Sequence, residues 1–110
     1  MIDWKRVEDL RDEIGDDDFA EVAGMFLEEA DQTVARLALG LAAAEVESQL
    51  HFLKGSALNL GLSDLAAICQ QGERLAASGC AAQVDLSIVV AIYQASRTAF
   101  SGGLNKGSVA

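Results

Sequence analysis

Apolar side chains recur at steps of three and four residues along most of this chain, and no proline interrupts the pattern. That spacing places apolar side chains on one face of an α-helix, whereas a half-buried strand would need strict alternation. Ala and Leu dominate the apolar residues, and aromatic residues make up only 5% of the sequence. This composition favours helix over sheet. We therefore expect an all-α protein.

The spacing, with glycines as stop signals, predicts five helices and a frayed end. We prefer a helix to a strand in the Val- and Ile-rich fifth segment, because a lone strand would have no pairing partner. Four similar apolar faces joined by short links predict an antiparallel four-helix bundle with a short additional N-terminal helix. The expected segments are helices over about 3–15, 18–40, 46–61, 63–79 and 85–100, within a single domain over 1–100, and a flexible tail over 101–110.

Several residues suggest how these helices begin and pack. Asp3 and Ser63 are suited to cap the first and fourth helices, and Asp18 with Glu21 resembles a capping box at the start of the second. Gly72 falls inside the fourth helix, where it costs roughly 1 kcal/mol against Ala, so we expect it to permit a close helix approach.

A chain of 110 residues corresponds to one domain. Its start lacks the apolar run of a signal peptide, and no segment approaches the ~20 apolar residues of a membrane span. Cys69 lies on an apolar helix face and Cys80 in a link, and two cysteines do not make a disulfide scaffold. We expect a cytoplasmic protein with reduced thiols.

The net charge of −9 is unevenly distributed. Residues 1–50 hold 14 acidic and 4 basic side chains, whereas residues 51–110 hold 3 and 4. So acidic a chain is a poor match for nucleic acid or an anionic membrane, and a site for an anion is to be sought in the second half. One histidine and no Cys-x-x-Cys pair argue against a metal site.

The single histidine, His51, occupies an unusual position on the third helix. On a helical wheel it lies about 140° from the core direction, which is set by Val46, Leu50, Leu53, Ala57 and Leu60. Lys54 and Gly55 lie one turn further on, beside the imidazole. Should His51 handle phosphate, Lys54 would offset the charge and Gly55 would let another protein approach closely. A lone surface histidine without a function is the alternative.

Charge along this helix is sparse. Lys54 is the only charged side chain between Glu47 and Asp64. We therefore expect surroundings of His51 that lack acidic groups and suit docking against an acidic pocket.

The segment His51-Phe52-Leu53-Lys54-Gly55-Ser56, followed by Leu60-Gly61, closely resembles the histidine-containing phosphotransfer (HPt) domain. The pattern of that family is His-x-x-Lys-Gly-Ser and then a Leu-Gly helix end. The Ile-Asp opening and Phe26-Leu27-Glu28 are similar too, and the resemblance extends over about residues 2–100. Many members carry a second Ser where this chain has Ala57.

The resemblance implies a phosphorelay intermediate in two-component signalling. His51 would accept a phosphoryl group from the aspartyl phosphate of a receiver domain, in a response regulator or a hybrid sensor kinase, and pass it to the Asp of another receiver. Lys54, Gly55 and Ser56 would support the transfer. No cofactor is expected on this chain; the receiver would supply Mg²⁺. We expect a monomer without kinase or phosphatase activity of its own.

Two other interpretations remain open. The chain could be an interaction module that docks receiver domains without carrying phosphate, with Phe52 and Leu58 as exposed docking residues. An enzyme with His51 as general base is less favoured, because no Asp or Glu has a spacing that orients the ring and no Ser or Cys is paired with it.

Overall fold

The computed structural model describes residues 2–109, with side chains described over residues 2–104. Within these residues the chain is helical and contains no strand, so the all-α prediction is confirmed. The elements are α1 (Trp4–Ile14), α2 (Asp16–Leu39), α3 (Ala43–Leu60), α4 (Ser63–Ala77), the short 3₁₀-helix η1 (Ala81–Gln83) and α5 (Leu86–Val109).

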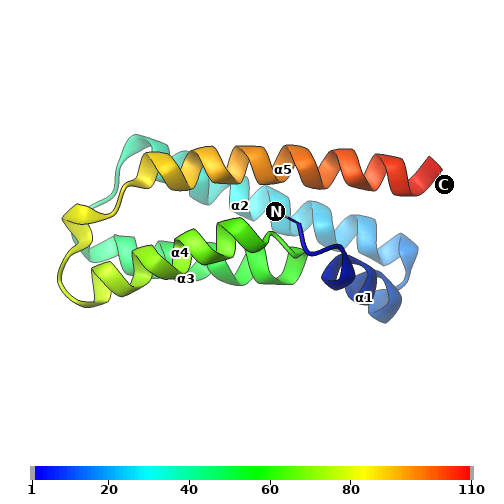
Figure 1. The fold of residues 1–110 in the computed structure, drawn as a ribbon, viewed down its shortest axis with the longest axis horizontal. Helices are drawn as coiled ribbons and strands as arrows, with labels where there is room; N and C mark the ends of the chain where they lie inside the picture. Colours follow the sequence, from blue (N-terminus) through cyan, green and yellow to red (C-terminus); the bar gives the residue numbers. More distant parts are fainter. Residues whose placement is uncertain (1, 110) are drawn as a thin grey trace.

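Four long helices run lengthwise through a molecule of 46 × 22 × 20 Å, and α1 lies across one end (Figure 1). Helix α2 contacts α3 and α5, and α4 contacts the same two helices, so the four form a closed ring of neighbours. Helix α1 packs on α2 and α3. The core draws on all five α-helices, through fully buried side chains such as Leu37, Leu50, Leu65 and Phe100 and through Val7 and Leu10.

The N-terminal segment is bound to the turn between α3 and α4. The Asp3 side chain caps α1 by accepting from the Arg6 amide at 3.2 Å, as expected. The Asp3 amide donates to the Gly61 carbonyl at 2.7 Å, and the Arg6 guanidinium donates to Asn59 at 3.3 and 3.4 Å. Gly61 has φ +75°, and a Cβ there would lie 2.6 Å from the Asp3 carbonyl oxygen. Gly61 is therefore required both by its own backbone and by the chain that passes over it.

The residues expected to cap the second and fourth helices are wrong. Helix α2 begins at Asp16, with Gly15 as its N-cap and no side-chain cap bond. Gly15, with φ 84°, is the single residue between α1 and α2. Its amide donates to the Arg11 carbonyl of α1, and its carbonyl accepts from the Phe19 amide of α2. Ser63 is likewise the first residue of α4 and does not cap it, because Leu62 holds the cap position.

The expected end of the fifth helix near residue 100 is also wrong. Helix α5 continues through residues 101–109, which were expected to be a flexible tail; residue 110 lies outside the described residues. The glycines serve packing here. Trp4 stacks on Phe100 with ring centroids 6.2 Å apart, and a Cβ on Gly103 would lie 2.1 Å from the Trp4 ring. Leu104 packs against the core one residue later.

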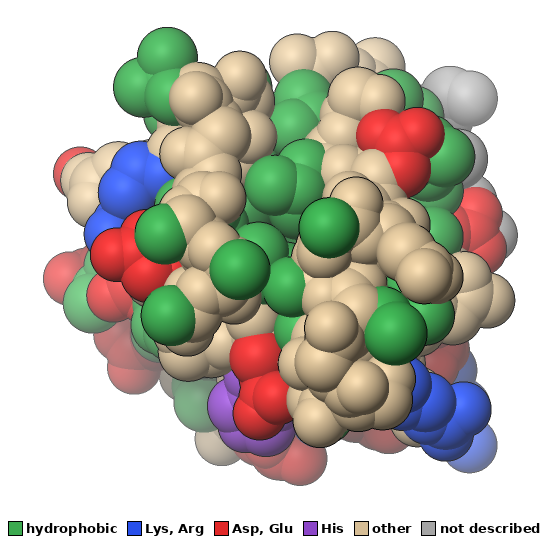
Figure 2. All heavy atoms as spheres, turned by 90° about the vertical axis from the view of Figure 1, so that its left-hand side faces the viewer, with side chains coloured by type: hydrophobic (Ala, Val, Ile, Leu, Met, Phe, Trp, Pro, Cys, Tyr) green, Lys and Arg blue, Asp and Glu red, His purple; other side chains and the backbone are tan. Residues whose placement is uncertain are grey.

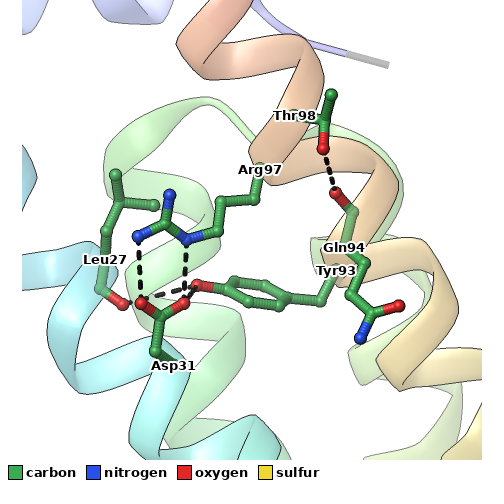
Figure 3. A network of polar contacts seen from close by, with 6 residues as sticks. All are labelled: Leu27, Asp31, Tyr93, Gln94, Arg97 and Thr98. Carbon is green, nitrogen blue, oxygen red and sulfur yellow. Dashed lines mark hydrogen bonds and ion pairs between the residues drawn. The ribbon is translucent and has the colours of Figure 1, made fainter.

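A polar network joins α2 to α5 (Figure 3). Arg97 binds Asp31 with two hydrogen bonds of 2.9 Å, and the Tyr93 hydroxyl donates to the same carboxylate. The bonds from Arg97 lower the pKa of Asp31 against the opposing effect of burial, and Tyr93 adds to the lowering. Burial and the Asp31 carboxylate raise the pKa of Tyr93, which keeps its hydroxyl a donor.

None of the described helices is both long and apolar enough to cross a lipid bilayer. Both cysteines are free: Cys69 is buried in the core, as expected, and Cys80 is half-buried. Burial, with the nearby Glu73 charge, raises the pKa of the Cys69 thiol to about 12, so this thiol is unreactive at neutral pH.

The Gly61 turn can be tested by substitution. Gly61→Ala should lower the free energy of unfolding by at least about 2 kcal/mol, because left-handed backbone disfavours a Cβ and the Asp3 carbonyl occupies its place. Gly24→Ala, in open space on α2, should instead raise it by about 0.5–1 kcal/mol. Urea denaturation measures both, and equal effects of the two variants would contradict the role of Gly61.

The Asp31 network predicts a pH-dependent contribution to stability. Because its pKa is lowered from 3.8 in the folded chain, the carboxylate stabilises the fold above pH 4 or so and loses this effect as the pH falls through the folded value. Asp31→Asn should cost about 1 kcal/mol at pH 7. The difference from the parent protein should shrink between pH 4 and pH 2, as followed by thermal unfolding; a constant difference would refute this explanation.

Candidate functional site

His51 stands on the outer face of α3. Leu50 and Leu53 are fully buried and so fix which face of α3 turns inward. The side chain of His51 is 72% exposed. Figure 2 views the molecule from the end that carries the α2–α3 and α4–α5 links, and shows the histidine on the surface with an acidic side chain against it.

The imidazole contacts the carboxylate of Glu73 on α4, and this carboxylate is shared by two partners on α3. Its Oε2 lies 3.1 Å from His51 Nδ1, and its Oε1 lies 3.0 Å from Lys54 Nζ. The carboxylate is largely shielded from water, since only 15% of the Glu73 side chain is exposed, against 22% for Lys54. The three side chains thus form one chain of contacts, with Glu73 in the middle.

Electrostatics keep Glu73 ionised. Burial alone would raise the pKa of this carboxyl, but the ion pair with Lys54 and the hydrogen bond with His51 outweigh it and lower the pKa. A carboxylate only accepts hydrogen bonds. In the neutral imidazole, Nδ1 therefore carries the proton and Nε2 keeps its lone pair. Among the described side chains none bonds to Nε2, which makes this nitrogen the available nucleophile of the site.

The packing of α3 on α4 brings Glu73 to this place. The two helices form a hairpin about Leu62, so residues equally far from Leu62 face each other, and His51 and Glu73 are such a pair. Gly72 sets the close approach, since a Cβ there would lie 2.4 Å from Leu50 Cδ1. The close approach expected at Gly72 is confirmed, and it brings α4 near enough to α3 for Glu73 to reach His51.

A surface groove adjoins the imidazole. It has a volume of about 590 Å³ and is formed by the first turns of α3 and the end of α4. Small side chains line much of it, with carboxylates at its edge; the lining residues are Ala43, Ala44, Glu47, Ser48, His51, Glu73 and Ala76. The groove therefore leads to the ring over small side chains, with the two carboxylates at its edge.

The other residues singled out from the sequence fall in three places. Gly55 is exposed with nothing within 4 Å of where a Cβ would be, so the surface one turn from His51 is bare. Phe52 and Leu58 are 46% and 57% exposed on either side of this surface. Ser56 is buried on the inward side of α3, so it is not brought together with His51.

Sequence reasoning missed Glu73, and its expectation of an acid-free surround is wrong. That expectation considered only neighbours along α3, whereas the carboxylate arrives from α4, 22 residues away. Folding the two helices into a hairpin about the Gly61-Leu62 turn would have paired residue 73 with residue 51. Over the described residues, no group of three or more His, Cys, Asp or Glu side chains could hold a metal ion.

The fold and the site together describe a helical protein with an accessible imidazole. The family model described as "Hpt domain" matches residues 21–99 of the chain, so the chain belongs to the Hpt family. Domains of this family act in phosphotransfer within two-component signalling, where they interact with receiver domains. A search of curated proteins found no match, and a search of solved structures found none either.

The bare surface at Gly55 yields a test with a matched control. We expect Gly55→Gln to slow phosphoryl exchange with a receiver by tenfold or more, because the new side chain would occupy the open surface over which we expect the receiver to approach. Gly24→Gln places the same side chain in the interior of α2, on the flank that also carries Asp31, and should leave exchange unchanged. Both changes should stabilise their helices by roughly 0.5–1 kcal/mol. The rate of radiolabel transfer is measured for both variants, and equal rates would rule out a close approach of the receiver at Gly55.

Proposed function

We propose that this protein is a phosphorelay intermediate that accepts a phosphoryl group on His51 from the aspartyl phosphate of one receiver domain and passes it to the Asp of another. The observation that carries the proposal is an exposed imidazole whose Nδ1 is bound by Glu73, which leaves Nε2 as nucleophile on the scaffold of a phosphotransfer family.

In the transfer step, the Nε2 lone pair attacks the phosphorus of the aspartyl phosphate. The N–P bond forms while the bond from phosphorus to the carboxyl oxygen breaks, and the electron pair leaves with the carboxylate. Transfer of this kind depends on positioning and on charge neutralisation. Glu73 holds the proton on Nδ1 and the plane of the ring in place, so the chain itself supplies the positioning.

The remaining site residues have supporting parts in this proposal. Lys54 offsets the phosphoryl charge, and Gly55 admits the surface of the receiver. Phe52 and Leu58, exposed on either side, dock the partner. Ser56 is buried and supports the site through the packing of α3.

The partners are receiver domains of response regulators, or of a hybrid sensor kinase. A Mg²⁺ ion on the receiver would neutralise charge on the transferring group, and we expect no cofactor on this chain and no kinase or phosphatase activity of its own. We also infer that the four long helices form an antiparallel bundle, which the closed ring of contacts supports. A monomeric state and a cytoplasmic location stay predictions of the sequence.

One observation favours the alternative of an enzyme with His51 as general base. Glu73 orients the imidazole, as a third group does for the base in such enzymes. Ser48 lines the same groove and is the candidate nucleophile among its lining residues. Its hydroxyl, however, donates to the Glu45 carbonyl at 3.1 Å and is not paired with the imidazole. The Ser–His contact that activates a nucleophile is therefore missing, and the phosphocarrier is the better-supported function.

The test is to incubate the protein with a ³²P-labelled receiver and Mg²⁺. We expect the label to move to this chain in a form that is labile to acid and stable to base, as a phosphoramidate is. The variant His51→Gln should take up no label while keeping its helical circular dichroism, since the His51 side chain is largely exposed.

The outcomes separate the candidate functions. Label that survives in His51→Gln would show that another residue is the acceptor. Absence of label from every receiver, with receiver binding retained, would favour the docking module that carries no phosphate.

A further inference from the structure

The ammonium of Lys54 is not free to bind a phosphoryl oxygen in this structure, because it already has an anionic partner. Its ammonium lies 3.0 Å from Glu73 Oε1, and only 22% of its side chain is exposed. An ion pair so far withdrawn from water is screened less than one on the open surface. Lys54 is therefore already committed to a partner while His51 is free of phosphate.

Among the described residues, Glu73 holds the only carboxylate that forms an ion pair with either His51 or Lys54. One of its oxygens binds His51 and the other binds Lys54. A phosphoryl group carries about two negative charges at neutral pH, so after transfer it would compete with Glu73 for the ammonium. His51 and Lys54 are three residues apart on one helix face, and the four-carbon stem of lysine is flexible enough to turn from one anion to the other.

We propose that Glu73 is a positioning residue. It holds the Lys54 ammonium in an ion pair and releases it to the phosphoryl group when His51 is phosphorylated. This inference rests on the proposed function. No covalent bond to Lys54 or Glu73 changes; the ammonium leaves Glu73 Oε1 for an oxygen of the phosphoryl group. The strength of the Lys54–Glu73 contact thereby sets how strongly the carrier holds its phosphate, and so how readily it passes the phosphate on.

The consequence is an energetic coupling between the two residues that appears only in the phosphorylated state. In the parent protein, Lys54 stabilises phosphohistidine only after it has left Glu73. In Glu73→Gln, the amide still accepts the Nδ1 proton of His51 but no longer competes as an anion for the ammonium. Lys54 should then favour phosphohistidine more strongly than in the parent.

A double-mutant cycle measures this coupling. The four proteins are the parent, Lys54→Met, Glu73→Gln and the double variant. Met keeps most of the apolar stem of Lys54 and removes its charge. The quantity measured is the equilibrium distribution of ³²P label between one receiver and this chain. We expect Lys54→Met to lower the labelled fraction on this chain about threefold in the parent and about tenfold or more in the Glu73→Gln background.

Asp64→Asn is the matched control, because it removes one acidic charge from the same helix at an exposed position. In that background Lys54→Met should act as in the parent. A ratio of two or less between the Glu73→Gln and parent backgrounds, or a larger effect in the parent, overturns the proposal. If the parent protein takes up no label at all, the proposed function fails instead, so the two failures are distinguishable.

Discussion

The close packing of α3 on α4 at Leu50 and Gly72 is the contact on which the rest of this structure depends. A side chain at position 72 would meet Leu50 Cδ1 at 2.4 Å, so the helices approach only because that side chain is absent. The contact fixes their register as well as their separation. Because His51 and Glu73 are the sequence neighbours of Leu50 and Gly72, this close approach in the core brings the two groups within hydrogen-bond distance on the surface.

A carboxylate held between an imidazole and an ammonium joins the two roles that a phosphocarrier needs. The ring must present a lone pair, and the negative charge it receives must be offset. In the function that we propose, Glu73 serves the first role through the contact of Oε2 with His51 and governs the second through the contact of Oε1 with Lys54. Since both partners lie on α3 while Glu73 lies on α4, the chemistry of the site depends on the stability of the helix pair. The network of Asp31, Tyr93 and Arg97 lies between the other two long helices and does not enter the site.

Much of the fold was predictable because its signals are local. The Asp3 cap, the stop at Gly61 and the apolar faces of five helices each act over one or two turns of chain, and the structure has each of them. The error at the end of α5 lies where a local signal met a tertiary contact. Gly102 and Gly103 are poor helix formers, yet α5 continues through them because the Trp4 ring packs against Gly103.

The sequence by itself determined the helices, the outward direction of His51 and the bare position at Gly55, because each follows from residue spacing on a single helix. Only the tertiary structure decided the electrostatic surroundings of the histidine. Glu73 is 22 residues from His51 along the chain, and its distance from the ring depends on how two helices pack. The spacing on α3 suggested a ring without acidic neighbours, whereas the folded protein places a shielded carboxylate against it and commits the nearby lysine to the same group.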